Sequence, residues 1–270
     1  MLTNYHTHTT FCDGKGTAEE VVLAAIAEGF DAIGFSSHGY TEYDLRYCMK
    51  DVCGYITEIV RLREKYKNQI EIYLGIEEDS RHINNRADFD YIIGSCHYVT
   101  SPEGIPSPLD SNRDYFQKAL SLFGGNELAL AEEYYSHFTD YILKYKPDII
   151  GHFDLLTKFS EKDFQIFLDD ERYWKIAEGY TDKALRSGSL FEVNTGLITR
   201  GYRTSPCPAP RLLRRIFKGG GNVVLSSDSH APETLSAYFD EARAILTDIG
   251  FKHAYALIGG KWQKYALNVN

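Results

Sequence analysis

The sequence predicts an α/β fold built on a parallel sheet. Seven short runs of apolar and β-branched residues alternate with segments of helical pattern, which is typical of strands joined by helices. Nearly every run is followed by His, Asp or Glu, as expected where the carboxyl ends of parallel strands form a site. With 270 residues, 43% of them hydrophobic, the chain can bury a sizeable core. This length allows either a closed barrel or an open sheet.

The expected strands are brief and do not alternate cleanly between apolar and polar residues, which indicates burial on both faces. In chain order they are Leu2–His6, Ala32–Phe35, Ile70–Ile76, Tyr91–Gly94, Asp148–Gly151, Leu190–Val193 and Asn222–Leu225.

Helical patterns fill most of the intervals between these strands. The first is introduced by Thr17, with Glu20 three residues later as in a capping box, and Gly29 closes it. The expected helices are Ala18–Glu28, Val52–Tyr66, Glu127–Tyr145, Glu171–Arg186, Pro210–Phe217 and Ala237–Thr247.

The longest stretch that we expect to be irregular is Val99–Asn126, which is rich in proline and contains the pair Gly124-Gly125. A loop of this length in a compact domain is usually functional or mobile, so it is a candidate lid over an active site. Because no repeat, low-complexity tract or Pro/Gly linker divides the chain, we expect residues 1–270 to form a single domain.

Composition and charge argue against several classes of protein. The net charge of −9 and the pI of about 5.5 give no basic footprint, so we expect no nucleic-acid partner. No apolar run approaches the ~20 residues of a membrane span, and we expect no membrane association. Five cysteines without a CxxC pair, and no signal peptide, predict free thiols in the cytoplasm. The oligomeric state stays open.

Potential metal ligands gather at the ends of the expected strands. Because these ends converge on one face in parallel α/β folds, residues far apart in the chain should meet there. The HxH and DxH spacings place both side chains on the same side of an extended segment. Imidazole and carboxylate suit Zn, Mn and Fe. Six of the nine histidines and three carboxylates share this placement: His6, His8, Asp13, His38, Glu77, His97, His152, Asp228 and His230.

The alternative is a cluster of structural histidines, which would have to satisfy every buried polar group by hydrogen bonds. The joint pattern favours metal. Glu77, Glu78 and Asp79 are adjacent, and we choose Glu77 as the ligand because it stands at the strand end. The three remaining histidines fall outside the pattern and are expected on the surface or in loops: His82, His137 and His253.

Successive motifs resemble those of the polymerase and histidinol phosphatase (PHP) family, in the family's order, from residue 5 to residue 230. They are YHTHTTFCDGKGT, GFSSH, GIEED, GSCHYV, GHFD and SSDSH. The resemblance implies a distorted (β/α)7 barrel with a metal site at the C-terminal ends of its strands.

The resemblance also implies three divalent ions, of Zn, Mn or Fe. His6, His8, Glu77 and Asp228 would hold the first, and Glu77 would bridge to a second that is also held by His97 and His152. The third would be held by Asp13, His38 and His230. We assign Glu77, Asp228 and His230 to catalysis as well as to metal binding.

Longer matches separate the branches of the family. Asp13 within FCDG, and the runs GHFDLLTKF, FEVNTGL and TSPCPAPRLL, are similar to the histidinol-phosphatase branch. The branch often has NTSG where this chain has Asn194-Thr195-Gly196. This resemblance implies hydrolysis of L-histidinol phosphate to L-histidinol and phosphate, a step of histidine biosynthesis.

Substrate-binding residues are expected near the strand ends. Arg200 and Arg203 follow the sixth strand and could bind phosphate oxygens, the alternative being solvated loop arginines. Glu42 and Asp44 follow His38 and could meet the substrate ammonium, although plain surface charge is the simpler interpretation.

Three rival functions remain. One is a phosphoesterase of the same fold that acts on another small phosphomonoester or a nucleotide. Another is an exonuclease or polymerase-accessory module, which the acidic charge disfavours. The last is a structural metal protein, but structural sites are typically closed and rich in Cys, whereas His and carboxylate with several ions suit open catalytic positions.

Overall fold

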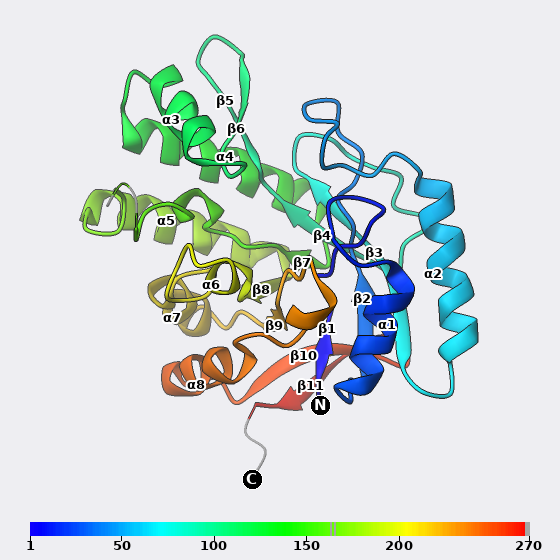
Figure 1. Cartoon of the computed structure of the whole chain (residues 1–270). Coiled ribbons are helices and arrows are strands. Elements are labelled where there is room, and N and C mark those ends of the chain that lie inside the picture. Colours follow the sequence, from blue (N-terminus) through cyan, green and yellow to red (C-terminus); the bar gives the residue numbers. More distant parts are fainter. Residues whose placement is uncertain (163, 165, 268–270) are drawn as a thin grey trace.

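The computed structural model describes residues 1–162, 164 and 166–267, and the strands within these residues form a nearly closed parallel barrel. The order in the sheet is β1-β2-β3-β4-β7-β8-β9, and every neighbouring pair is parallel. Figure 1 shows these strands at the centre, with helices packed around them. The bounds are β1 (Thr3–Asn4), β2 (Ala32–Phe35), β3 (Glu71–Asp79), β4 (Tyr91–Ser95), β7 (Ile149–Ile150), β8 (Leu190–Asn194) and β9 (Val223–Ser226).

The first and last strands of the sheet approach each other just beyond their carboxyl ends. Thr7 and Ser229 pair in a parallel bridge. The amide of His8 donates to the carbonyl of Ser229 at 2.8 Å, and the amide of Ser229 donates to the carbonyl of His6 at 3.1 Å. This contact brings the HxH segment next to the DxH segment and all but closes the barrel.

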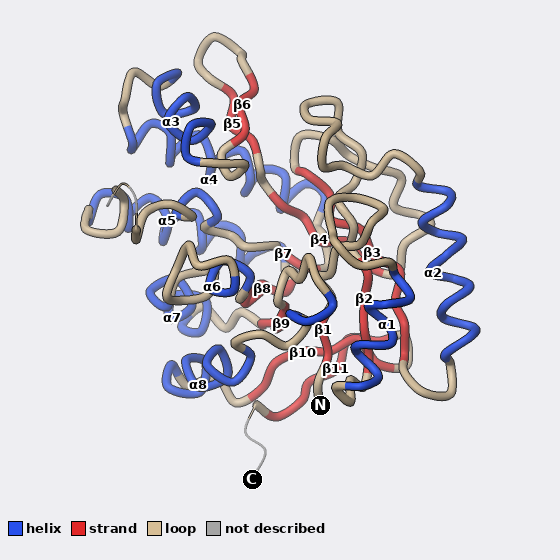
Figure 2. Tube along the Cα trace, viewed as in Figure 1, coloured by secondary structure: helices blue, strands red, loops and turns tan. Residues whose placement is uncertain are grey.

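Helices cover the outside of the barrel, as the tube in Figure 2 shows. The capping box at the start of α1 is present, because Thr17 and Glu20 each bond the other's backbone. The helices are α1 (Ala18–Ala27), α2 (Val52–Tyr66), α3 (Arg113–Leu122), α4 (Glu127–Tyr145), α5 (Glu171–Ala184), α6 (Gly196–Thr199), α7 (Pro210–Lys218) and α8 (Phe239–Ile249), with single 3-10 turns η1 (Leu155–Thr157), η2 (Leu185–Ser187) and η3 (Pro232–Thr234).

The seven expected strands and six expected helices are present, with shifted ends. The first strand is shorter than Leu2–His6, and the last helix begins at Phe239 rather than Ala237 because its N-cap, Tyr238, lies in the left-handed region. Within the described residues, no helix is long and apolar enough to cross a membrane.

The expectation that Val99–Asn126 is irregular was wrong. The segment contributes to a hairpin of β5 (Tyr98–Thr100) and β6 (Pro106–Pro108), and it contains α3. Proline is tolerated on an edge strand because its missing N–H is not needed by a neighbour. Asn112 caps α3 by accepting from the amide of Tyr115.

A second hairpin, which the sequence did not predict, is formed by β10 (His253–Ile258) and β11 (Lys261–Ala266). Figure 1 shows it beside the N-terminus, at the end of the barrel where the strands begin. Tyr5 donates to the carbonyl of Leu257 and accepts from its amide, and Trp262 packs edge-on against Tyr5 and Tyr91. Aromatic side chains therefore fill this end, which leaves the opposite end for polar groups.

Candidate metal centre

All nine candidate metal ligands lie together at the C-terminal ends of the barrel strands. Four overlapping groups among the described residues bring ligand atoms within 4.8 Å of one another. They are His8, Asp13, His38 and His230; His6, His8 and Asp228; His6, Glu77 and His152; and His38, Glu77 and His97.

Glu77 lies at the centre of this cluster and is buried. Its Oε2 is 2.8 Å from His38 Nδ1, 3.2 Å from His6 Nε2 and 3.5 Å from His8 Nε2. Its Oε1 is 3.0 Å from His152 Nε2 and 3.3 Å from His97 Nε2. Both carboxylate oxygens thus face imidazole nitrogens, which is an arrangement suited to a carboxylate that bridges two cations.

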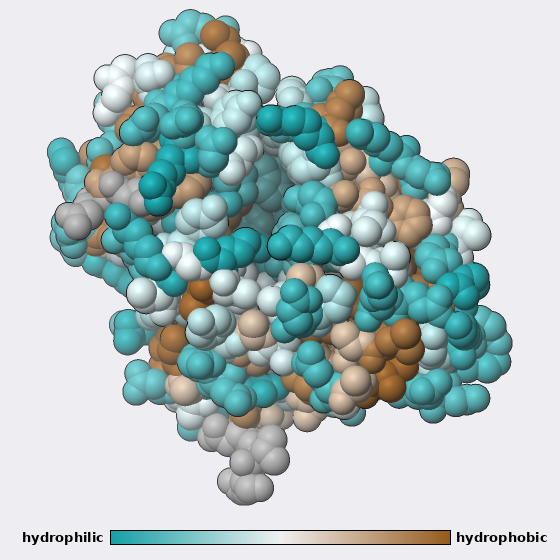
Figure 3. Space-filling model, in the orientation of Figure 1, coloured by the Kyte–Doolittle hydropathy of each residue, from teal (hydrophilic) through white to brown (hydrophobic). Residues whose placement is uncertain are grey.

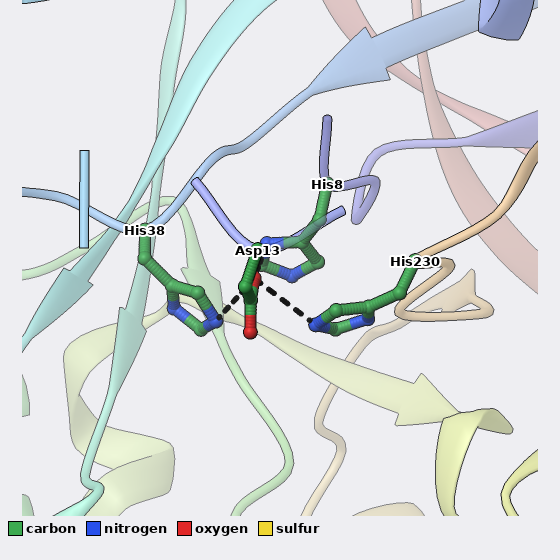
Figure 4. Close-up of side chains that lie close together, drawn as sticks. All are labelled: His8, Asp13, His38 and His230. Atoms are coloured by element: carbon green, nitrogen blue, oxygen red, sulfur yellow. Dashed lines mark ion pairs between the residues drawn. The ribbon is translucent and has the colours of Figure 1, made fainter. Parts of the chain in front are cut away.

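Asp13 organises the outer part of the cluster. Its Oδ1 is 3.4 Å from His230 Nε2, 3.7 Å from His38 Nε2 and 4.0 Å from His8 Nδ1. Figure 4 shows the carboxylate between the rings of His38 and His230, with His8 behind it. The Asp13 side chain is 37% exposed, so this part of the cluster opens to solvent.

Several buried atoms at the centre have no hydrogen-bond partner among the described residues. They include His6 Nε2, His8 Nε2 and Glu77 Oε2, although the two nitrogens lie 3.2 and 3.5 Å from that oxygen. An unpaired buried polar atom is costly, and a cation bound by lone pairs removes that cost. Histidine and carboxylate ligands suit Zn²⁺, Mn²⁺ or Fe²⁺, so the residues present fit such ions.

Burial and neighbouring charged groups shift the pKa values of several residues in the cluster. Burial opposes the charge of Glu77, but the histidines around it, His38 first, hold its pKa well below the usual range. Burial also opposes protonation of His6, yet Glu192 and Glu77 raise its pKa well above the usual range. Burial, together with the neighbouring imidazoles of His230 and His38, lowers the pKa of His8 to about 3. A neutral His8 keeps the lone pair that metal binding requires.

Two buried carboxylates behind the cluster were not predicted from the sequence. Glu192 Oε1 is 2.6 Å from His6 Nδ1, and Asp79 Oδ2 is 3.2 Å from His97 Nδ1. The available signals were an acidic residue inside the apolar run of β8, and the position of Asp79 two residues after Glu77, on the same side of β3. Glu78 instead faces away and pairs with Arg86 and Tyr141.

A cavity of about 480 Å³ opens onto the cluster. Figure 3 shows a hollow on this face, rimmed mainly by hydrophilic residues. The sequence did not predict several polar residues of its wall, among them Tyr47, Asp110 and Lys158. Lys158 Nζ donates to the carbonyl of Asp110 at 2.5 Å and lies 3.6 Å from its carboxylate, which joins the loop after β6 to the segment after β7.

The predicted substrate-binding residues occupy different places. Arg200 lines the cavity and donates to Asp228 Oδ2 at 2.8 Å. Arg203 does not line it: its buried guanidinium pairs with Asp154 at 3.2 Å and bonds Thr157. Glu42 is exposed and lies outside the cavity wall.

Asp44 does line the cavity and is paired with Arg46. A charged residue after a strand was therefore not enough to predict the cavity wall. The orientation of each loop decides whether its side chains point inward.

The three histidines outside the strand-end pattern also lie outside the metal-ligand groups of the described residues. His253 is exposed, at the start of β10. His137 bonds Ser80, and His82 packs edge-on against Tyr40.

Comparison with known proteins places these features in a family. Residues 4–196 match the PHP domain. A probable histidinol-phosphatase of Schizosaccharomyces pombe is 30% identical over 274 residues, which cover 93% of this chain and 87% of the relative. A probable histidinol-phosphatase of Deinococcus radiodurans is 29% identical over 265 residues, which cover 92% of this chain and 94% of the relative.

A solved structure supports the fold. The histidinol phosphate phosphatase of Lactococcus lactis, complexed with zinc, L-histidinol and phosphate, matches with a TM-score of 0.74 at 22% identity, over 97% of this chain and 99% of that one. This likeness confirms the expected barrel. Because the family match runs from the first strand of the barrel to the sixth, over more than half of the sequence, the chain belongs to the PHP domain family.

Proposed function

We propose that this chain is a metal-dependent phosphatase that hydrolyses L-histidinol phosphate to L-histidinol and phosphate. The observation that carries the proposal is the position of Glu77, whose two carboxylate oxygens face imidazoles beside an open cavity. Similar proteins support this choice of substrate: two are probable histidinol-phosphatases, and the Lactococcus enzyme was crystallised with L-histidinol and phosphate.

The nine clustered residues would hold three divalent ions of Zn, Mn or Fe. Asp13, His38 and His230 would hold one, and Glu77 would bridge the other two, one with His6, His8 and Asp228 and one with His97 and His152. Bound ions in such sites lower the pKa of water and offset the charge of the phosphate. The nine ligands and the cavity belong, in this proposal, to a single domain of residues 1–270.

The reaction joins a water oxygen to phosphorus and breaks the bond between phosphorus and the ester oxygen, which leaves as an alcohol after taking a proton. We assign Glu77, Asp228 and His230 to catalysis, because they stand where the cavity meets the cluster. Arg200 would donate to phosphate oxygens from the same wall.

The organic part of the substrate carries positive charge on its ammonium. Asp44 and Asp110 present carboxylates along the cavity wall, whereas Glu42 does not reach it. We therefore keep Asp44 for the expected ammonium contact and replace Glu42 by Asp110. All five cysteines are free, and we propose the cytoplasm as the place of action.

Phosphate release from a panel of phosphomonoesters tests this function. A site that pairs with the ammonium and imidazole rejects analogues lacking them, often by ~10⁴-fold or more in kcat/KM. L-histidinol phosphate should therefore exceed p-nitrophenyl phosphate, simple sugar phosphates and a nucleoside monophosphate by orders of magnitude. Comparable kcat/KM for a nucleoside monophosphate would reject the substrate and favour a phosphatase of broader or different specificity.

A further inference from the structure

We propose that Glu192 is a positioning residue of the metal centre, which holds His6 in the tautomer whose Nε2 lone pair faces Glu77 and Asp228. The inference rests on the proposed metal centre but not on the identity of the substrate. Glu192 lies in β8 and is fully buried. Burying a carboxylate in a barrel interior is costly, so its partners must explain its presence.

The two oxygens of Glu192 have different partners. Oε1 lies 2.6 Å from His6 Nδ1. Oε2 accepts from the backbone amide of His152 at 2.7 Å and from Asn194 Nδ2 at 3.0 Å. One carboxylate therefore connects the ends of three strands, β1, β7 and β8, behind two candidate ligands.

The contact with His6 determines where its proton lies. A carboxylate accepts only, so the facing Nδ1 keeps its hydrogen, and it is the proton on Nε2 that a metal ion would displace to bind that nitrogen. Within the part of the chain that the structure describes, that Nε2 is buried without a hydrogen-bond partner, 3.2 Å from Glu77 Oε2 and 3.7 Å from Asp228 Oδ1. A carboxylate behind a histidine ligand also increases its basicity.

Asn194 connects Glu192 to a second candidate ligand, Asp228. It lies two residues after Glu192 and on the same side of β8. Its Nδ2 is 3.3 Å from Asp228 Oδ2, and its Oδ1 accepts from the amide of Gly196 at 2.8 Å. Glu192 thus fixes an amide that in turn faces Asp228.

The substitution Glu192→Gln removes the negative charge and nearly preserves the shape of the side chain. Glutamine has a single acceptor oxygen, so its NH₂ must face either His6 Nδ1 or the two donors at His152 and Asn194. One donor is left facing another donor in a buried place. The matched control is Glu78→Gln, because Glu78 is also fully buried but pairs with Arg86 and Tyr141 outside the cluster.

Zinc affinity of the metal-free proteins, measured against a chromogenic chelator, tests the proposal. Loss of such a supporting contact typically weakens metal binding by 10–100-fold, and we expect a loss of this order at one or more sites in Glu192→Gln. Glu78→Gln should bind zinc as the wild type does. Equal affinity in Glu192→Gln and wild type would overturn the inference.

The same titration distinguishes the two proposals. A wild-type protein that binds no zinc would overturn the metal centre and this inference together. A wild type that binds zinc but does not hydrolyse L-histidinol phosphate would overturn the substrate alone.

A second measurement needs no change at Glu192 and so does not depend on the folding of that variant. The ¹⁵N resonances of His6 in zinc-loaded wild-type protein, assigned by their loss in His6→Gln, report which ring nitrogen carries hydrogen. We expect a protonated Nδ1 and a zinc-bound Nε2. A hydrogen on Nε2 would contradict the assigned role of Glu192.

Discussion

His38 and Glu77 are joined through their backbones as well as their side chains. The two residues pair in a parallel bridge, the amide of Gly39 donates to the carbonyl of Glu77 at 2.8 Å, and His38 Nδ1 lies 2.8 Å from Glu77 Oε2. The bridge continues the register of β2 and β3, in which Phe35 pairs with Leu74. The sheet therefore sets the backbone positions from which both side chains meet.

Metal content should approach three equivalents per chain after careful reloading of the protein with Zn, Mn or Fe. The reason is the number of candidate ligands, nine, and their arrangement in overlapping groups around Glu77 and Asp13. Elemental analysis of the dialysed protein measures the ratio. One equivalent or fewer in a fully active enzyme would be incompatible with a trinuclear centre.

Asp13→Ala should remove one ion and reduce turnover by orders of magnitude, with little effect on folding. The carboxylate faces His38 and His230, but its side chain is 37% exposed and contributes little to the core. Metal analysis, phosphate release and thermal unfolding of the same sample separate these effects. Full activity with all ions retained would show that Asp13 is only a loop carboxylate.

Mutation to alanine should reduce catalysis at Arg200 but folding stability at Arg203. Arg200→Ala should lower kcat/KM for all phosphate esters alike, because Arg200 lines the cavity and can read only the shared phosphate. Arg203→Ala should chiefly lower the free energy of unfolding, by about 3–5 kcal/mol, because it leaves buried Asp154 without its ion-pair partner.

Chemical denaturation and steady-state kinetics of both variants check this difference. The sequence alone treated the two arginines alike. A stable Arg203→Ala protein with a selective loss of phosphate-ester turnover would instead support the original prediction that Arg203 binds substrate.

His137 should make folding stability depend on pH. Burial, reinforced by nearby Arg81, lowers the pKa of His137 from 6.5 to about 4. The unfolded chain then binds more protons between these values, so the contribution of neutral His137 is present above pH 6.5 and is lost as pH falls towards 4. This contribution to the free energy of unfolding is on the order of 1–3 kcal/mol.

Denaturant unfolding of wild type and His137→Gln between pH 4 and pH 7 measures this contribution. The difference in unfolding free energy between the two proteins should change across the window. The same measurement on the exposed His253, changed to Gln, is the control. A pH-independent difference for His137→Gln would contradict the lowered pKa.

The sequence by itself determined the α/β class, the seven barrel strands and the residue types at their ends. These features are local, because a buried strand requires an apolar run and the capping box of α1 requires Thr17 and Glu20 at a fixed spacing. Convergence of the candidate ligands followed from a general property of parallel strands. The barrel and the family entered through resemblance, which the comparisons then confirmed.

Only the tertiary structure decided which polar side chains face the centre. It placed Glu77 inward and Glu78 outward, put Arg200 on the cavity wall and Arg203 in a buried ion pair, and set Glu192 behind His6. These outcomes depend on the register between strands and on loop orientation, which arise from contacts between segments distant in the chain. Glu192 and His6 are 186 positions apart, so no local pattern could have indicated their contact.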